Sequence, residues 1–249
     1  MPYVTIDPSR YDAESPITES LIADIIGNID AVESLADGTW TPLTGTGTYT
    51  VPSGVTKLRV LVVSGGAGGC GVGSTTKYGG GGAGGGVREA VLTVSATVSY
   101  SCGAGGAGSG QSSSGAGGTT TFGTLSVNGP AGITWVLNAH QSGGTVALDC
   151  FSGGNVGRGS LDSSSHHSAL VGGTHGTTNE GGGGGPMCMP YSMDGIETYL
   201  GNGGNGGSVS ALPTNGSLYG AGGGGSGYDG TVQTGGNGSA GIIFVSPIG

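Results

Sequence analysis

The chain has 249 residues, of which 62 are Gly and only 8% are charged. Because Gly normally makes up about 7% of a protein, this composition excludes the core of an ordinary globular enzyme. The glycines keep no sustained every-third-residue register and there are only 10 Pro, which excludes a collagen triple helix. The net charge of -9 argues against nucleic-acid binding, and no apolar stretch approaches the roughly 20 residues of a membrane span.

The first 43 residues differ in composition from the rest of the chain. They hold two Gly and eight acidic residues against a single Arg. Ser15 and Pro16 signal the start of a helix, which the apolar pattern predicts to continue to Ala36. The seam positions of this helix follow spacings of three and four residues, as in a coiled coil that prefers three strands; they are Ile22, Ile25, Ile29 and Val32. We therefore expect residues 1–43 to form an acidic helical arm that docks on a partner or makes a homotrimer. The alternative is a helix that lies on its own chain.

Residues 44–249 predict a mainly β body. Strand patterns occur at 47–52, 57–64, 87–94, 97–102, 119–127, 133–138 and 241–245. Leu58, Val60 and Val62 share one face of the second strand, and the turn at 53–55 predicts that the first two strands pair as a hairpin. The run 242–245 is apolar on both faces, which predicts a strand in the middle of the core. These strands suit an antiparallel β-sandwich of the jelly-roll type.

Blocks of Gly lie between the strands, each about as long as a strand. They are 65–73, 79–86, 103–118, 181–185, 201–207 and 220–227. An ordered solution is the polyglycine II-type helix, which rises about 3.1 Å per residue without internal hydrogen bonds. Neighbouring helices can then satisfy each other's amides. We expect a packed bundle of such helices, with flexible loops as the alternative.

Five stretches share their order with a known family. They read YTVPSGVTKLRV at 49–60, GGAGG at 65–69, YSCGAGGAG at 100–108, GTTTFG at 118–123 and GGNGSAGIIFV at 235–245. Together they resemble the glycine-rich domain of bacteriophage tail-fibre and tail-tip proteins, over residues 44–249. The same architecture occurs in glycine-rich domains of animal receptor kinases, so the domain alone does not fix a function.

The resemblance implies a virion attachment protein, located in a tail fibre, tail tip or spike, that acts as an adhesin. Such a protein binds a host cell-surface receptor, a glycan or an outer-membrane protein, without catalysis or membrane insertion. The chain opens without a signal peptide, which fits synthesis in the host cytoplasm. Residues 1–43 would dock on other virion proteins as part of a homotrimer. A purely structural fibre or vertex component stays open, and ice binding is disfavoured by the broken Gly register.

Two regions are candidate recognition loops. The first, at about 135–200, combines aromatic, His and Arg side chains where Gly thins out. The second, at 212–228, carries Leu212, Leu218, Tyr219 and Tyr228 among Gly and small polar residues. Rigid rings among small polar residues supply contact area at little entropic cost, as in recognition surfaces. The candidate receptor-binding residues are Trp135, His140, Phe151, Arg158, His166, His167, Tyr191, Tyr199, Tyr219 and Tyr228. The alternative is that the large rings cap the core and the histidines are solvated.

The sequence favours neither an enzyme nor a cofactor. No GxSxG motif is present, and the GxGxxG-like string at 65–70 is expected by chance in a chain so rich in Gly. We expect no metal; the alternatives are His166 and His167 with His175, or the run 187–189. The four Cys lie in four separate segments, which indicates idle thiols rather than a zinc or redox motif.

Overall fold

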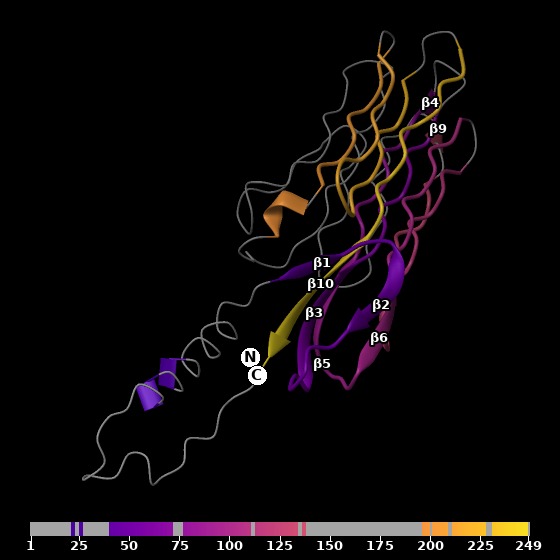
Figure 1. Cartoon of the computed structure of the whole chain (residues 1–249). Helices are drawn as coiled ribbons and strands as arrows, with labels where there is room; N and C mark the ends of the chain where they lie inside the picture. Colours follow the sequence, from indigo (N-terminus) through magenta and orange to yellow (C-terminus); the bar gives the residue numbers. More distant parts are fainter. Residues whose placement is uncertain are drawn as a thin grey trace.

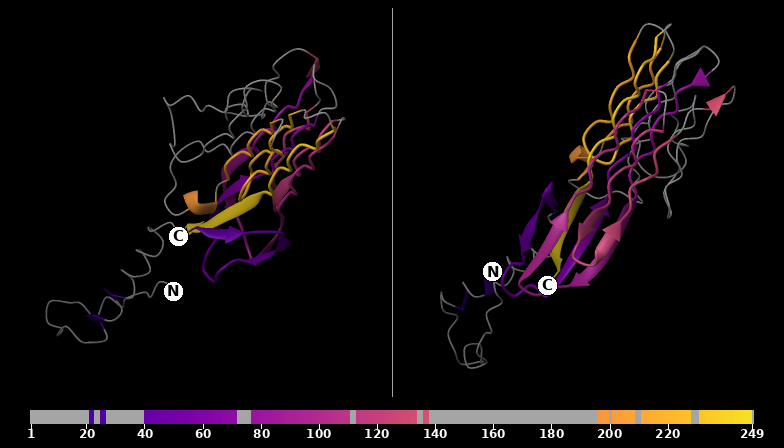
Figure 2. Two further views of the ribbon diagram at one scale, coloured as in Figure 1. Left: turned by 90° about the horizontal axis from the view of Figure 1, so that it is seen from above. Right: turned by 90° about the vertical axis from the view of Figure 1, so that its right-hand side faces the viewer.

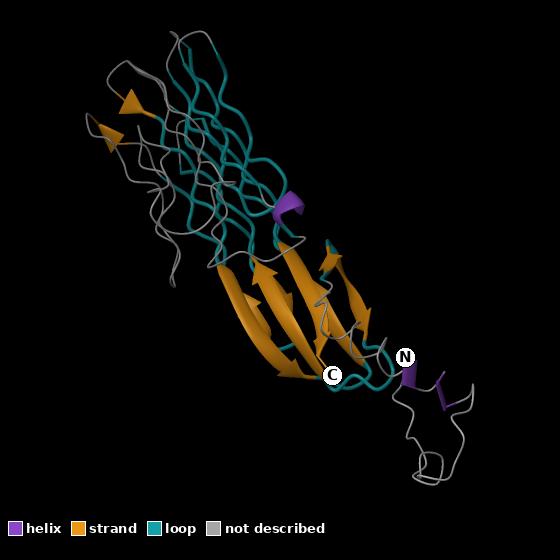
Figure 3. Ribbon diagram, turned by 90° about the vertical axis from the view of Figure 1, so that its left-hand side faces the viewer, coloured by secondary structure: helices purple, strands orange, loops and turns teal. Residues whose placement is uncertain are grey.

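The computed structural model describes residues 21–22, 25–26, 40–71, 77–110, 113–133, 136–137, 196–199, 201–208, 211–227 and 231–248. In this part the protein is mainly β. The longer strands gather at one end, and Gly-rich segments run from them side by side as an elongated extension (Figure 1). Figure 3 shows the same division, with strands at one end and segments without regular secondary structure at the other.

Two four-stranded antiparallel sheets form what we call the two-sheet body. The first has the order β1 (Thr41–Leu43), β10 (Ile242–Ile248), β3 (Lys57–Val63), β5 (Val87–Thr93). The second has the order β2 (Thr46–Thr50), β6 (Thr97–Ser101), β7 (Thr120–Phe122), β8 (Leu125–Val127). A further pair, β4 (Lys77–Tyr78) and β9 (Val136–Leu137), lies apart from both sheets near the far end of the extension (Figure 1).

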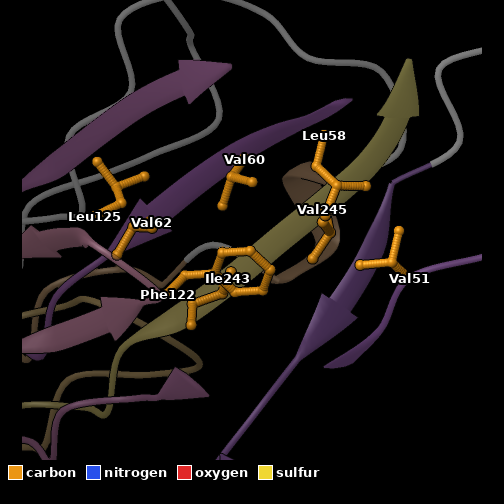
Figure 4. Close-up of a cluster of buried hydrophobic side chains, with 8 residues drawn as sticks. All are labelled: Val51, Leu58, Val60, Val62, Phe122, Leu125, Ile243 and Val245. Atoms are coloured by element: carbon orange, nitrogen blue, oxygen red, sulfur yellow. The ribbon is translucent and has the colours of Figure 1, made fainter. Parts of the chain in front are cut away.

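A cluster of buried side chains joins the two sheets (Figure 4). Leu58, Val60 and Val62 point from one face of β3, as the alternation predicted, and Phe122 and Leu125 meet them from the second sheet. Burying one such side chain contributes about 1.5–3 kcal/mol. This cluster therefore holds the two sheets face to face.

The opposite face of the first sheet carries a second buried cluster. Leu61 and Val63 of β3 and Ile242 and Phe244 of β10 form it together with Ile196, which precedes the short 3-10 helix η2 (Glu197–Tyr199). Strand β10 lies between β1 and β3 and is buried on both faces. The prediction of a central strand at the end of the sequence is confirmed.

The predicted hairpin between the first two strands is wrong. Strand β2 pairs with β6 in the second sheet, whereas β3 pairs with β10 and β5 in the first. Val51 is buried, and its amide donates to the Ala96 carbonyl at 2.9 Å, outside any pairing with β3. Pro52 has no amide to donate to a ladder, so the chain leaves one sheet at this point and enters the other.

Several predicted boundaries also change. The strand predicted at 119–127 is two strands, β7 and β8, which pair with each other around Gly123. Gly123 has a φ of 55°, a left-handed conformation that favours Gly in a tight turn. Of the strand predicted at 133–138, residues 136–137 form β9 and residue 133 is not in a strand, while the other three lie outside the described residues. The sequence analysis did not predict β1 or β4.

Four described residues fall within the predicted N-terminal helix, and all four are helical: 21–22 and 25–26. Leu21 is buried, whereas Ile22, Ile25 and Ile26 are 45%, 43% and 51% exposed. The other two predicted seam positions, Ile29 and Val32, lie outside the described residues. No helix in the described part has the length and hydropathy needed to cross a membrane.

The central position of β10 leads to a stability prediction. Phe244→Ala removes a fully buried ring that touches the second cluster, so we expect the free energy of unfolding to fall by about 3–5 kcal/mol. Val91→Ala on β5 is the control, because Val91 is 58% exposed and its truncation should change stability by no more than about 0.5 kcal/mol. Chemical denaturation followed by circular dichroism measures both, and equal effects would contradict the central role of β10.

Candidate functional site

Nine extended segments make up what we call the glycine bundle. They are 64–71, 79–86, 103–110, 113–119, 128–133, 201–208, 211–217, 220–227 and 231–241. Six of them directly continue strands of the two-sheet body, because they follow β3, β6 and β8 or precede β5, β7 and β10. The segments lie side by side in the perpendicular views of Figure 2. All six continuations leave the body at the same end, so the bundle projects in one direction.

The segment 64–71 lies inside the bundle, and its hydrogen bonds repeat every third residue. Its amides donate in rotation to three neighbours: Gly65 and Gly68 to segment 113–119, Gly66 and Gly69 to segment 231–241, and Ala67 and Cys70 to segment 79–86, at N···O distances of 2.8–3.0 Å. Its carbonyls accept from two further segments, 103–110 and 220–227. One segment is thus bonded to five others, and the expectation that amides bond between segments is confirmed.

This packing leaves no room for side chains at the inner positions. A Cβ added to Gly66 would lie less than 3.0 Å from the Ala221 carbonyl oxygen, and one added to Gly69 would meet the Gly224 carbonyl in the same way. Because these obstacles are backbone atoms, no rotamer change relieves the overlap. The abundance of Gly is therefore a requirement of the close approach between segments.

Segments on the outside of the bundle show the same period in their exposure. Along 201–208, buried residues recur at Gly201, Gly204 and Gly207, while Asn202 and Asn205 are exposed. The buried positions face segment 220–227, since the amides of Gly204 and Gly207 donate to it at 2.9 and 2.8 Å. An outer segment thus contacts the bundle with every third residue and presents side chains with another third.

Polar side chains tie the antiparallel segments 201–208 and 211–217 together. The Ser217 amide donates to the Asn202 carbonyl at 3.0 Å, and the Asn202 amide donates to the Ser217 hydroxyl oxygen at 2.9 Å. Three residues further, Thr214 and Asn205 repeat both bonds at 3.0 and 2.7 Å. Hydroxyl side chains thus supply the acceptors that a second backbone would supply inside the bundle.

Two Asn side chains also accept backbone amides, and they link three neighbouring segments: 211–217, 231–241 and 103–110. The Asn237 amide donates to Oδ1 of Asn215, and the Gly108 amide donates to Oδ1 of Asn237, each at 2.8 Å. Both Asn side chains are exposed. These bonds fix the orientation of each carboxamide group on the surface.

The sequence analysis named none of these Asn, Ser and Thr residues as binding residues, although Thr214, Asn215 and Ser217 lie in its second candidate region, 212–228. A signal was present, since Asn202 and Asn205 are three residues apart, as are Thr214 and Ser217. The spacing acquires its meaning only once the two segments are known to be neighbours. A search restricted to aromatic and charged residues passes over such a pattern.

Two of the predicted receptor-binding residues are described, and both lie where the bundle joins the body. The Tyr199 ring packs edge-on against Phe244, with 5.5 Å between ring centroids. Tyr219 is partly buried against the same cluster, and its amide and carbonyl bond to Tyr199 and Gly201 at 3.3 and 3.2 Å. The other eight lie outside the described residues: Trp135, His140, Phe151, Arg158, His166, His167, Tyr191 and Tyr228.

Charged side chains gather on the outer face of the first sheet. Arg59 forms an ion pair with Glu89 on the neighbouring strand, and its guanidinium lies 5.1 Å from the centroid of the Trp40 ring. Among the described residues, no group of three His, Cys, Asp or Glu could hold a metal ion. The alternative metal sites of the sequence analysis, at His166, His167 and His175 and at 187–189, lie outside this part of the chain.

Two thiols are described, and neither is in a disulfide. Cys70 is buried within the bundle, where its Sγ donates to the Gly71 carbonyl at 3.3 Å. Cys102 lies at the end of β6, where its Sγ donates to the Leu43 carbonyl at 3.3 Å. Burial raises the pKa of Cys102 to about 11. This thiol is protonated, and hence a poor nucleophile, at neutral pH.

The raised pKa of Cys102 leads to a pH prediction. The unfolded thiol ionises near pH 8.5, whereas the folded thiol keeps its proton up to about pH 11. The unfolded state therefore binds fewer protons between these values, and the free energy of unfolding falls as the pH rises from about 9 to about 11. Cys102→Ala should make this fall less steep in urea titrations at pH 8, 9, 10 and 11. Parallel pH profiles for the two proteins would contradict the assignment.

The packing of the bundle leads to a second prediction. Gly66→Ala should destabilise the protein by at least about 1–3 kcal/mol, because the new methyl group meets backbone on a neighbouring segment. Gly110→Ala is the matched control, because the nearest atom to its Cβ is Cγ1 of Val232 at 3.4 Å, an ordinary contact. Urea denaturation should find Gly110→Ala neutral, or more stable by up to about 1 kcal/mol. Equal destabilisation by both changes would exclude backbone crowding as the cause.

One family of known proteins matches the chain. The match is to a glycine-rich domain and covers residues 41–246. No curated protein matches. The matched range starts with β1 and ends within β10, so it takes in the two-sheet body and the glycine bundle together. The chain therefore belongs to the glycine-rich domain family.

Proposed function

We propose that this protein is a bacteriophage virion attachment protein, in a tail fibre, tail tip or spike, that binds a host cell-surface receptor without catalysis. The observation that carries the proposal is the one-directional glycine bundle. Its segments leave the two-sheet body at a single end and are bonded to each other along their length. Such a projection holds its far end at a fixed distance from the body.

We further propose that the bundle segments are polyglycine II-type helices on a jelly-roll-like sandwich. The rotation of hydrogen bonds along 65–70 supports this, because amides three residues apart donate to the same neighbour. A helix of three residues per turn without internal hydrogen bonds produces this repeat. The inner glycines that exclude a Cβ support it as well.

Stiffness serves attachment, since a preorganised surface loses less entropy when it binds. The aromatic and His-containing region at 135–200, together with Tyr228, supplies the receptor contacts in this proposal. Tyr199 and Tyr219 support this region indirectly in the proposal: their half-buried rings pack against the core and stabilise the base of the bundle. The receptor is a glycan or an outer-membrane protein.

The N-terminal arm is the proposed docking element for other virion proteins. Ile22 and Ile25 are 45% and 43% exposed, as expected of apolar side chains that a partner helix buries in the assembly. Packing of three such helices would place these side chains at a shared seam. The proposed assembly is a homotrimer within the virion, made in the host cytoplasm.

Binding of the labelled, purified protein to intact cells tests the function. A panel of bacterial hosts is incubated with the full chain and with a variant that lacks residues 1–39 and so keeps Trp40 and β1. We expect saturable binding of both to one host, and a loss of about 30-fold or more for Trp135→Ala or Tyr191→Ala if these rings are binding hot spots. Folding of each variant is checked by circular dichroism.

Absence of binding to every host by the folded protein would overturn the attachment proposal. The remaining candidate would then be a structural fibre or vertex component, for which the same changes should block particle assembly. If particles that carry these changes assemble normally but fail to adsorb to cells, the structural alternative is excluded and the attachment role is supported.

A further inference from the structure

One side of the glycine bundle is a regular, uncharged surface. Three neighbouring segments form it, 103–110, 231–241 and 211–217 with the adjoining Leu218, and hydrogen bonds link the first to the second and the second to the third. Each presents exposed residues at three-residue spacing: Ala104 and Ala107; Thr231, Thr234, Asn237 and Ala240; Leu212, Asn215 and Leu218. We call this surface the amide face.

The amide face repeats along the bundle. At about 3.1 Å per residue in an extended three-residue helix, the rows repeat about every 9 Å. The segments that build the face run beside each other in both views of Figure 2. A surface with such a repeat offers equivalent contacts to a long, repeating partner.

The chemistry of the face is neutral. None of the residues of its three segments is acidic or basic, in a chain of net charge -9. It carries three of the large exposed aliphatic side chains, Leu212, Leu218 and Val232, which are 71%, 57% and 53% exposed. Cationic side chains strengthen the binding of anionic polymers and phosphates, and the face has none, so it suits a neutral partner better.

The two Asn carboxamides add oriented donors. Oδ1 of Asn215 and Oδ1 of Asn237 accept backbone amides at 2.8 Å. A carboxamide has one acceptor oxygen and one NH₂ group. With the oxygen engaged by the bundle, the NH₂ group is the part of each side chain left to donate to a partner in solvent.

We propose that the amide face binds a neutral polysaccharide laid along the bundle. Hydroxyl and ring oxygens of sugars accept from the Asn NH₂ groups, and the apolar faces of the rings pack on Leu212 and Leu218. Neutral sugars fit the absence of charge on the three segments, and their repeat fits the rows. This inference rests on the proposed attachment function, since it names a class of receptor and a second surface that takes it, beside the contacts proposed for residues 135–200 and Tyr228.

Affinity electrophoresis tests the proposal with defined polymers. The full chain is run in native gels that contain dextran, mannan or hydroxyethylcellulose, with polygalacturonate as the anionic comparison. We expect at least one neutral polymer to retard the protein, and polygalacturonate not to. Asn215→Asp and Asn237→Asp each keep the oxygen that accepts the backbone amide but lose the NH₂ donor, so each should weaken binding by 10-fold or more.

Asn128→Asp is the matched control. Asn128 is also an exposed Asn whose Oδ1 accepts a hydrogen bond, from Thr119 Oγ1 at 3.3 Å, but it lies on segment 128–133, outside the amide face. It adds the same charge and should leave binding unchanged. Equal weakening by all three changes would overturn the proposal, and so would the absence of retardation in all neutral polymers.

Light scattering on the same proteins tests the competing occupant. If the wild type self-associates and Asn215→Asp abolishes this, the face is covered by a second copy and the proposal is overturned. The outcome is also separable from that of the attachment function. Saturable cell binding without polysaccharide binding removes only this inference, whereas polysaccharide binding without cell binding removes only the attachment role.

Discussion

The hydrogen bond between backbones of neighbouring extended segments is the interaction on which this structure depends. An amide and a carbonyl can pair between segments only when both backbones approach closely, and a Cβ at the inner positions would overlap a neighbouring carbonyl. Gly permits the approach but loses more conformational entropy on folding than any other residue. Many lateral bonds must therefore form together, each contributing about 0.5–1.5 kcal/mol net. A segment such as 64–71, bonded to five others, gains most from this arrangement.

The two-sheet body supplies what the bundle lacks. The bundle has few side chains to bury, whereas the body has two apolar clusters that share the strands β3 and β10. These two strands continue into segments 64–71 and 231–241, which are hydrogen-bonded neighbours in the bundle. The pairing of β3 with β10 thus brings two of the Gly segments together at their base. Apolar burial in the body favours the same alignment that the lateral bonds require, so the two parts fold in support of each other.

The outer segments show how the bundle ends in solvent. Inside, most acceptors are backbone carbonyls, joined by a few buried hydroxyls such as Ser239 Oγ, which accepts from the Ala221 amide. At the surface, side-chain oxygens of Asn215, Asn237, Thr214 and Ser217 take that role. This substitution satisfies amides that another Gly segment would otherwise have to satisfy. A row of amides without acceptors could pair with a further segment or another chain, as the open edge of a β-sheet does. The polar residues therefore limit the width of the bundle and, at the same time, create its oriented surface groups.

From the amino-acid sequence one can predict the mainly β body, the face shared by Leu58, Val60 and Val62, the central strand at 242–245 and the bonding of Gly segments to each other. These follow from periodicity and composition, which are local properties of the chain. Only the tertiary structure decided that β2 and β3 lie in different sheets, because strand pairing depends on partners such as β6 that are distant in sequence. It alone also decided that Asn215 and Asn237 lie side by side and that Tyr219 packs against the core. A three-residue repeat gives each segment three nearly equivalent sides. The repeat itself does not specify which segment lies on which side, because this depends on the packing of the whole bundle.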